Sequence, residues 1–368
     1  MKKQRLDEIQ FARALAMFSV LFVHCTSYGI ANLNPESTFY PIYTTLNTIG
    51  KLGVPVFFML SGFVLFYAYY PREFTKKLVI DFYKKRIKYI VIPYIVISSL
   101  YVTYYNILYY SYPSTTEMLK SYVTFIIHGN ASYHTYFLIV LIQFYLLFPI
   151  LLWVFKKITS FKSWMFIFGL VLHLVFWNLN VKYSIVSNAS IVFLSYISFF
   201  LLGGQLGVYY GQVRSWIVEH KGKLVTIFGT LYFVIITTLA IMDYSIFTNK
   251  FTELMENYSI FSINGFSYYL WIAQGLVASI FLILIGLYFV EMKFEKIKTT
   301  LLNLATVSFG IYLFHPLVLN IVGKFLVTSN SMLFHVYQFL IFIIILIVSW
   351  MITKLLMKLP FGWLFIGK

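Results

Sequence analysis

The sequence has few charged residues and a single cysteine. Only 11% of its 368 residues are charged, 60% are hydrophobic and the mean hydropathy is +0.82. Soluble domains have about 25% charged residues, so this composition excludes a soluble globular protein and indicates an integral membrane protein. One cysteine, Cys25, excludes an internal disulfide and a cysteine-rich metal site. The seven histidines are scattered, so the sequence predicts no metal site.

Ten apolar runs approach the ~20 residues that a helix needs to cross a ~30 Å hydrocarbon core. The predicted spans are 9–29, 51–70, 87–108, 134–155, 163–180, 188–209, 223–242, 265–290, 300–322 and 333–355. We therefore expect an all-α, polytopic fold with a single transmembrane domain over residues 1–368, without linkers or repeats. No small-residue cleavage site follows the first run, which is interpreted as a retained span rather than a signal peptide. Residues 121–128 are too short to span, and the segments 30–50, 109–133 and 243–264 are predicted to be outer loops or short interfacial helices.

The basic residues alternate between the two sides of this layout. Of the 28 Lys and Arg residues, 22 fall on the side of both termini and five on the other side. This asymmetry follows the positive-inside rule and predicts that both termini are cytoplasmic, in a multi-pass protein of a bacterial plasma membrane. The net charge of +16 is then mostly a topological signal, so we expect the lipid bilayer, and no nucleic acid, as a partner.

Two ionisable residues, Arg13 and His24, lie inside the first predicted span. Eleven helical steps bring their side chains to within about 20° on one face, about 16 Å apart along the axis. Ionisable residues in a span usually face a cavity or a partner. The structural alternatives are that Arg13 snorkels to the cytoplasmic headgroups and that His24 is a hydrogen-bonded packing residue.

The spacing of Arg13 and His24 is comparable with an extended phosphopantetheine arm. Arg13 would hold the phosphates of coenzyme A near the cytosol through its planar guanidinium. His24 would then meet the thioester deeper in the membrane and act as a general base for acyl transfer to a hydroxyl. We therefore predict acyl-CoA as a co-substrate, with no permanently bound cofactor.

Several motifs, in order along the chain, resemble those of acyltransferase family 3, the membrane O-acyltransferases. The Arg-x₁₀-His pattern of Arg13 and His24 is one of them. The others are GVPVFFMLSGFVL (53–65), KKRIKYIVIPYI (84–95), YHTYFLIVLIQFYLLFPIL (133–151) and SFGIYLFHPLVL (308–319). The matches cover essentially the whole chain, although Tyr136 stands where the family has Trp.

This resemblance implies an acyl-CoA-dependent transferase that acylates sugars of exported or cell-surface glycans. It gives His24 the catalytic histidine role and Arg13 a donor-binding role. Arg86 matches the first arginine of the family's Arg-x-x-Arg motif in the third span. The second position is Tyr89, with Lys88 adjacent, so whether Lys88 substitutes in donor binding stays open.

The basic cluster that contains Arg86 also has an ordinary explanation. Lys84, Lys85, Arg86 and Lys88 lie at the predicted cytoplasmic mouth of the third span. They would seat nucleotide phosphates, or serve topology and attraction to anionic lipids. Arg214 is explained in the same way by topology and attraction to anionic lipids, and it matches no motif of the family.

Three further residues are candidates for acceptor binding or for support of His24. Tyr312 and His315 share a face of the ninth predicted span, at a depth like that of His24, so we expect the three side chains to converge. The alternative for His315 is a hydrogen bond to a backbone carbonyl that Pro316 leaves without a donor. His134 opens the fourth span on the outer side, where an acceptor sugar would arrive, or is an interfacial residue.

Two other chemistries are disfavoured. Cys25 points about 100° away from its neighbour His24 on a helix, which argues against a Cys–His nucleophile. No carboxylate falls inside the predicted spans, which argues against a proton-coupled transporter but leaves a flippase open.

The predicted function is transfer of an acetyl or succinyl group from cytosolic acyl-CoA to a hydroxyl of a cell-surface or exported glycan. Direct attack and an acyl-histidine intermediate are both open. The alternatives are a polysaccharide exporter or flippase without acyl transfer, and acylation of a non-glycan acceptor. Polysaccharide synthesis or export machinery would be a separate partner. The sequence does not fix an oligomeric state.

Overall fold

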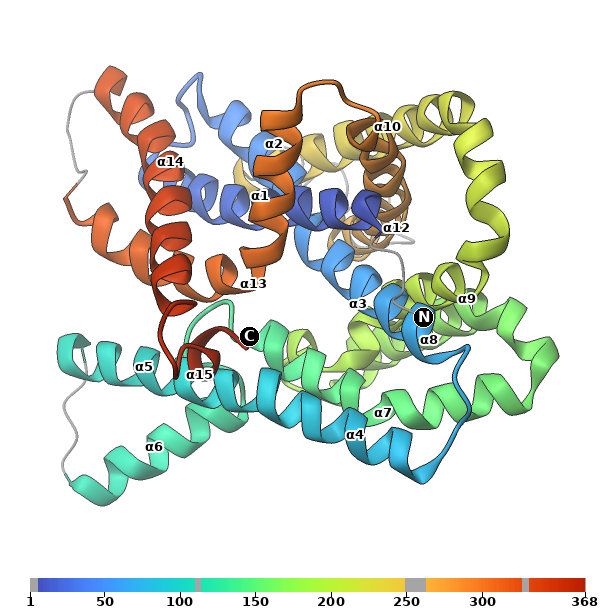
Figure 1. The fold of residues 1–368 in the computed structure, drawn as a ribbon. Helices are drawn as coiled ribbons and strands as arrows, with labels where there is room; N and C mark the ends of the chain where they lie inside the picture. The colour runs from blue at the N-terminus through green and yellow to red at the C-terminus, as the bar shows by residue number, and fades with distance from the viewer. Residues whose placement is uncertain (1–5, 110–113, 249–262, 326–330, 368) are drawn as a thin grey trace. The chain divides into compact units, whose positions relative to one another are not determined.

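The computed structural model describes residues 6–109, 114–248, 263–325 and 331–367, and all regular elements in these ranges are helical (Figure 1). As predicted, ten segments of the described chain are long and apolar enough to cross a membrane. They are Asp7–Asn32, Tyr40–Tyr69, Lys76–Tyr109, Tyr136–Lys157, Thr159–Tyr183, Phe193–Glu219, Lys221–Thr248, Gly265–Val290, Glu295–Gly323 and Met332–Leu356. The protein is therefore an all-α polytopic membrane protein.

The chain divides into two compact units. The first unit consists of residues 1–60 and 211–349, and the second of residues 61–210 and 350–368. The boundaries fall within three helices, α3 (Gly53–Tyr69), α9 (Ile197–Glu219) and α14 (Ser331–Leu356). A single functional domain over residues 1–368 stays a prediction.

In the first unit, α1 (Asp7–Asn32) packs against α2 (Tyr40–Gly50), α12 (Ile263–Val290) and α13 (Glu295–Gly323). The short α2 also packs against α10 (Lys221–Thr248). Close packing of α1 on α12 depends on Gly286, because a Cβ there would collide with the carbonyl oxygen of Glu8. The helix that carries His24 is thus held on several sides by neighbours.

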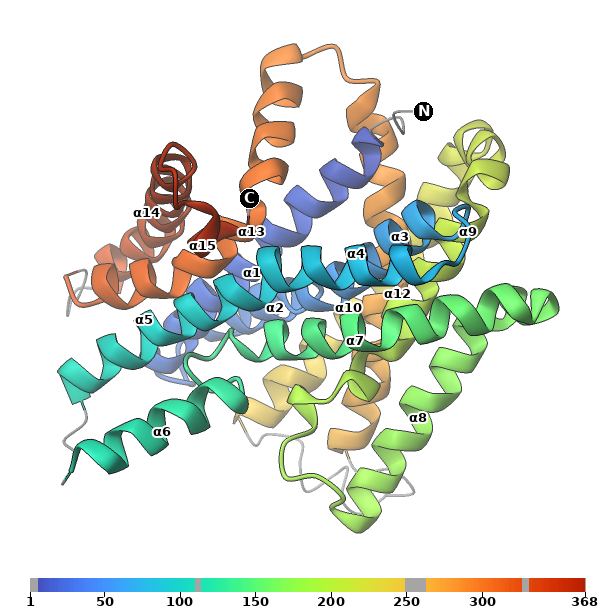
Figure 2. The ribbon, with the colours of Figure 1, turned by 60° about the horizontal axis from the view of Figure 1, so that its bottom comes forward.

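In the second unit, α4 (Lys76–Arg86) runs through a π-helical turn, Ile87–Val91, into α5 (Ile92–Tyr109) as one rod (Figure 2). The N–H of Ile92 bonds to the carbonyl of Ile87, one residue further back than in an α-helix. Pro93 follows and has no N–H with which to continue the α-helical pattern. Single π-helical turns of this kind are frequent at functional sites.

The remaining helices of this unit pack around that rod and around α9. Helix α4 contacts α7 (Tyr136–Lys157), and α5 contacts α6 (Thr115–Ile127) and α15 (Trp363–Ile366). Within α3, a Cβ on Gly62 would collide with the carbonyl of Phe200 on α9, so the glycine permits close packing of these two helices. Gln143 of α7 donates to the carbonyl of Ile191 at 2.7 Å and accepts from the N–H of Phe193 at 3.0 Å.

The three segments that were predicted as outer loops or short interfacial helices contain helix. Segment 30–50 contains α2, which joins α3 in one candidate span. Helix α6 is not among the candidate spans, in agreement with the prediction that this stretch is too short. Helix α10 continues to Thr248, and residues 249–262 lie outside the described residues. The predicted end of the seventh span at 242 was therefore too early.

Candidate functional site

His24 on α1 lies against His315 on α13. The two imidazole rings are nearly parallel, with an interplanar angle of 27° and centroids 5.2 Å apart. His315 is only 1% exposed. The expected convergence of these residues is confirmed by this contact, which joins two helices that pack directly on one another.

Pro316 explains why His315 has a fixed orientation. A proline inside a helix leaves the carbonyl four residues earlier without its usual donor, and here that carbonyl belongs to Tyr312. Nδ1 of His315 lies 2.6 Å from this oxygen. A carbonyl only accepts, so Nδ1 carries the hydrogen and Nε2 is the basic nitrogen of the ring. The predicted bond to a freed carbonyl is therefore present, together with the contact to His24.

The ring of Tyr312 completes this aromatic group. It is 3% exposed, and its centroid lies 5.7 Å from that of His315 at an angle of 48°. Phe57 of α3 meets Tyr312 edge-on at 6.3 Å. His24, His315 and Tyr312 therefore form a continuous set of ring contacts, as the sequence predicted, inside the first unit.

Arg13 lies on the same helix as His24, eleven residues earlier, and is partly buried. Its Nη1 lies 3.4 Å from Oε1 of Gln10, one turn towards the N-terminus. The uninterrupted α1 confirms the helical geometry on which the shared face of Arg13 and His24 depends. Its role towards a donor stays a prediction.

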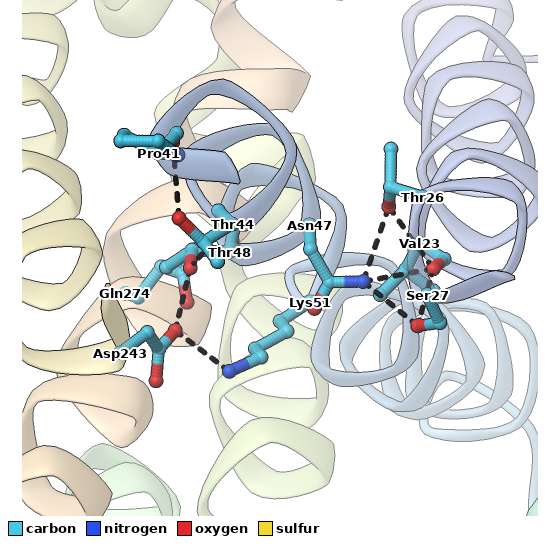
Figure 3. Close-up of polar contacts among 10 residues, drawn as sticks. All are labelled: Val23, Thr26, Ser27, Pro41, Thr44, Asn47, Thr48, Lys51, Asp243 and Gln274. Atoms are coloured by element: carbon cyan, nitrogen blue, oxygen red, sulfur yellow. Dashed lines mark hydrogen bonds and ion pairs between the residues drawn. The ribbon is translucent and has the colours of Figure 1, made fainter. Parts of the chain in front are cut away.

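Asn47 of α2 is bound to the segment of α1 that carries His24 (Figure 3). Its Nδ2 donates to the carbonyl of Val23 at 2.9 Å, and lies 3.1 Å and 2.8 Å from the hydroxyls of Thr26 and Ser27. These partners stand on both sides of His24 in the sequence. Asn47 thus fixes α2 to α1 at the level of His24.

The opposite side of α2 is bound to α10 through Asp243 (Figure 3). Oδ2 of Asp243 accepts from the hydroxyl of Thr48 at 2.5 Å and from Nζ of Lys51 at 2.7 Å. Gln274 of α12 donates to the carbonyl of Thr48 at 2.9 Å. A polar network therefore connects α1, α2, α10 and α12.

Asp243 lies one residue beyond the predicted end of the seventh span, at 242, and is 6% exposed. The helix that carries it, Lys221–Thr248, is long and apolar enough to cross a membrane. The sequence did contain a signal for the network: Thr44, Asn47, Thr48 and Lys51 are polar residues at the spacing of three and four that is typical of a helix. That signal went unused because the segment was predicted to be an outer loop or a short interfacial helix.

A further buried carboxylate lies at the start of α1. Oε1 of Glu8, which is 1% exposed, accepts from Nε of Arg214 at 2.7 Å. This ion pair gives Arg214 a structural partner. Helix α1 begins at Asp7, two residues before the predicted start of the first span, so Glu8 belongs to its first turn.

Arg86 ends α4 in the second unit and faces aromatic rings. Its guanidinium carbon lies 5.0 Å from the ring centroid of Phe82 and 4.7 Å from that of Tyr145. Nε of Arg86 is buried and has no hydrogen-bond partner. The stacked, planar guanidinium therefore has donor capacity that a phosphate would satisfy.

Lys88 points to different partners. Its Nζ lies 5.3 Å from the ring centroid of Tyr89 and 5.1 Å from that of Trp363 on α15. These rings differ from those that Arg86 contacts, Phe82 and Tyr145. Lys88 is exposed, as are Lys84 and Lys85.

His134 lies just before α7 in the second unit and is 1% exposed. Its ring meets Tyr101 edge-on at 5.0 Å and Tyr133 at 5.9 Å. The ring of His134 is therefore buried among aromatic rings, and its position at the membrane interface stays a prediction. A role in acceptor binding stays a prediction, and His134 is described separately from the His24 group because the two lie in different units.

Cys25 lines an apolar cavity of about 390 Å³ between α1, α2 and α14. Phe22, Leu46 and Phe342 are among the other lining residues. The ring of His24 is instead in contact with His315 on α13. Within the described residues, no group of three His, Cys, Asp or Glu side chains could hold a metal ion.

The sequence motifs resemble those of a family of membrane acyltransferases. A family model described as an acyltransferase domain matches residues 6–354, so the chain belongs to acyltransferase family 3.

Proteins of Staphylococcus aureus are among those to which the chain is similar. The chain is similar to the probable poly-beta-1,6-N-acetyl-D-glucosamine export protein of Staphylococcus aureus strain MRSA252. The two are 25% identical over 352 residues, which cover 91% of this chain and 88% of the relative. The proteins of that name from strains MSSA476 and MW2 match to the same extent. No solved structure matches the chain.

Proposed function

We propose that the protein transfers an acyl group, acetyl or succinyl, from cytosolic acyl-CoA to a hydroxyl of a cell-surface or exported glycan. The observation that carries the proposal is the contact of His24 with the anchored ring of His315, on a helix that also bears Arg13. Membership of an acyltransferase family supports acyl transfer. The name of the staphylococcal relatives supports a glycan as the acceptor.

In the proposed reaction, His24 is the general base. Its imidazole takes the proton of the acceptor hydroxyl while the oxygen attacks the thioester carbonyl. The new C–O bond forms, the C–S bond breaks, and the coenzyme A thiolate takes the proton from His24. His315 is a positioning residue, since its ring is bound to the helix backbone and packs on the ring of His24.

Arg13 of the first unit and Arg86 of the second are each proposed to bind phosphates of the donor, and Lys88 is proposed as a further donor-binding residue. The partly buried, stacked guanidinium of Arg86 favours the planar, bidentate binding that phosphates prefer. With both termini in the cytoplasm, a cytosolic donor would serve an outer acceptor without crossing the membrane as a whole. Separate synthesis or export machinery would supply the glycan.

An exporter or flippase is the second candidate, and two observations favour it. The relatives are named as probable export proteins. The pair of Asp243 and Lys51 is an ionisable pair inside candidate spans, where charged residues often mark a transport path. This candidate predicts that export, rather than acylation, is lost with the gene.

One complementation experiment separates the two candidates. Cells that lack the gene receive wild type or His24→Ala at equal abundance, and mass spectrometry measures the amount of surface glycan and its acyl substituents. Normal amounts of unacylated glycan with His24→Ala would support the transferase. Acylation that persists with His24→Ala would contradict the role of His24. Loss of export in the deletion, with full restoration by His24→Ala, would favour the exporter.

A further inference from the structure

A small cavity lies in the second unit. Its volume is about 230 Å³, and it lies between α5, the end of α6 and the turn that precedes α7. Its polar lining residues are Tyr105, Asn106, Asn130, Ser132 and Tyr133, and Val102, Phe125 and Ala131 also line it. None of these residues takes part in the proposed reaction.

The lining determines the chemical class of ligand that fits. It contains no Lys, Arg, Asp or Glu, so it offers no counter-charge to a phosphate or to another ion. Two side-chain amides and a serine hydroxyl make it too polar for a hydrocarbon chain, in contrast to the apolar cavity at Cys25. Amides and hydroxyls bond sugar hydroxyls, while tyrosine rings cover the apolar C–H face of a sugar ring.

Ser132 provides an independent indication of a ligand. It is 6% exposed, lines the cavity, and its hydroxyl has no hydrogen-bond partner. Buried hydroxyls in proteins normally have a partner, so this one needs an explanation. A ligand hydroxyl in the cavity would satisfy it after a rotation about χ1 of Ser132.

The wall that carries Ser132 is rigid. The hydroxyl of Thr135 lies 2.6 Å from the carbonyl of Gly129, 2.7 Å from that of Ser132 and 3.1 Å from the Ser132 N–H. Gly129 has φ of +67°, which a residue with a side chain rarely adopts, so the turn depends on glycine. A rigid turn binds a ligand without a further loss of conformational entropy.

We infer that this cavity is a subsite for one neutral sugar residue of the acceptor glycan. The inference rests on the proposed function, since it identifies where that acceptor binds. Tyr133 is the main stacking residue, because it lines the cavity and 44% of it is exposed. Asn106, Asn130 and Ser132 bond the hydroxyls of the sugar.

Kinetics with a defined acceptor test the subsite. The protein is reconstituted in lipid nanodiscs, with acyl-CoA saturating and a β-1,6-linked N-acetylglucosamine oligosaccharide as the acceptor. Tyr133→Ala should raise the KM for the oligosaccharide about tenfold or more, as expected when a stacking aromatic is lost. The KM for acyl-CoA should not change. Tyr133→Trp, which keeps an aromatic face, should behave like wild type.

The matched control is Tyr183→Ala. Tyr183 is also an exposed tyrosine of the second unit, at the end of α8 (Met165–Tyr183), and it does not line the cavity. This variant should retain the wild-type KM for the oligosaccharide. An equal rise in KM for Tyr133→Ala and Tyr183→Ala would overturn the subsite.

Binding without the donor separates failure of the subsite from failure of the proposed function. Saturation-transfer NMR with the same oligosaccharide should show binding to wild type and its loss in Tyr133→Ala. Binding that is the same in both proteins would overturn the subsite, even if His24-dependent consumption of acyl-CoA supports the transferase. Tyr133-dependent binding without any turnover of acyl-CoA would support the sugar subsite and contradict the transferase.

Discussion

The ring of His24 rests on the ring of His315, and the ring of His315 is in turn bound to the backbone of its own helix. The main-chain bond fixes the orientation of the His315 ring within the first unit. This anchoring fits a role for His315 as the ring that positions His24.

Substitution of the two histidines should separate these roles. His24→Ala should lower kcat by about 10²–10⁴-fold, the usual contribution of a general base. His315→Ala should lower kcat by up to about 10²-fold, because it removes the support of His24 and not the base itself. Acyl-CoA consumption by purified protein in nanodiscs measures both. Equal losses for the two variants would contradict the assignment of a single base.

Pro316→Ala tests the anchor of His315. Alanine restores a backbone N–H that bonds the carbonyl of Tyr312, and this N–H competes with Nδ1 of His315. We expect a lower kcat together with unchanged or higher thermal stability. Pro149→Ala, at the other proline inside a described helix, is the control and should not lower kcat. A Pro316→Ala variant with wild-type kcat would show that this bond does not matter for the reaction.

The network of α2 should contribute to stability through Asp243. Asp243→Ala leaves the cation of Lys51 without this acceptor, while the hydroxyl of Thr48 keeps only the carbonyl of Thr44. Loss of one partner of a buried pair costs about 3–5 kcal/mol, and we expect the lower end because the Lys51 side chain is 33% exposed. Unfolding in mixed detergent micelles measures the loss. The double variant Asp243→Leu/Lys51→Leu should recover most of it, and a double variant less stable than Asp243→Ala would argue against the pair.

Arg86 should matter more than Lys88 for the donor. Hydrogen bonds to charged groups contribute about 1.5–3 kcal/mol, so Arg86→Ala should raise the KM for acyl-CoA by roughly 10–100-fold. Lys88→Ala should have a clearly smaller effect, since Lys88 is exposed and lies against Trp363. With an acyl-pantetheine donor, which lacks the nucleotide, Arg86→Ala and wild type should have the same KM. A persistent difference would show that Arg86 does not act on the phosphates.

Cys25 should be dispensable for the reaction. It lines the apolar cavity, whereas His24 contacts α13. Cys25→Ala is expected to retain kcat within about twofold, because a buried cysteine usually behaves as a small hydrophobic residue. A loss of kcat as large as that of His24→Ala would point to a thiol nucleophile. Acyl-enzyme trapping followed by mass spectrometry would then locate the acyl group.

Hydropathy and helix periodicity in the sequence predicted the membrane-spanning helices and the grouping of His24 with His315 and Tyr312. The ten spans follow from hydropathy alone. The ring contacts that join His24 to His315, and His315 to Tyr312, follow from the predicted depth of these residues in the membrane and from helix periodicity. The bond of His315 to the Tyr312 carbonyl was also predictable, because the rule for proline is local. These features depend on residues whose environment is set within one helix or by the bilayer.

Features that depend on where a helix ends, or on which helices become neighbours, were not predictable. The seventh span was predicted to end at residue 242, before Asp243. Local hydropathy falls at a polar residue even when a distant side chain pairs with its charge. Lys51 supplies that partner from 192 positions earlier. The divergence of Arg86 and Lys88 likewise depends on Tyr145 and Trp363, which no local pattern connects to them.

The ion pair of Glu8 and Arg214 has a consequence for how the protein is made. The ribosome synthesises Glu8 206 residues before its partner. Helix α1 must therefore reach the membrane while the cation that neutralises its carboxylate does not yet exist. Lys51 is likewise synthesised before its partner Asp243, and in this pair the cation comes first and the carboxylate later. Both ion pairs can therefore form only after α9 and α10 have been synthesised, so the final packing of α1 and α2 is a late step of biogenesis.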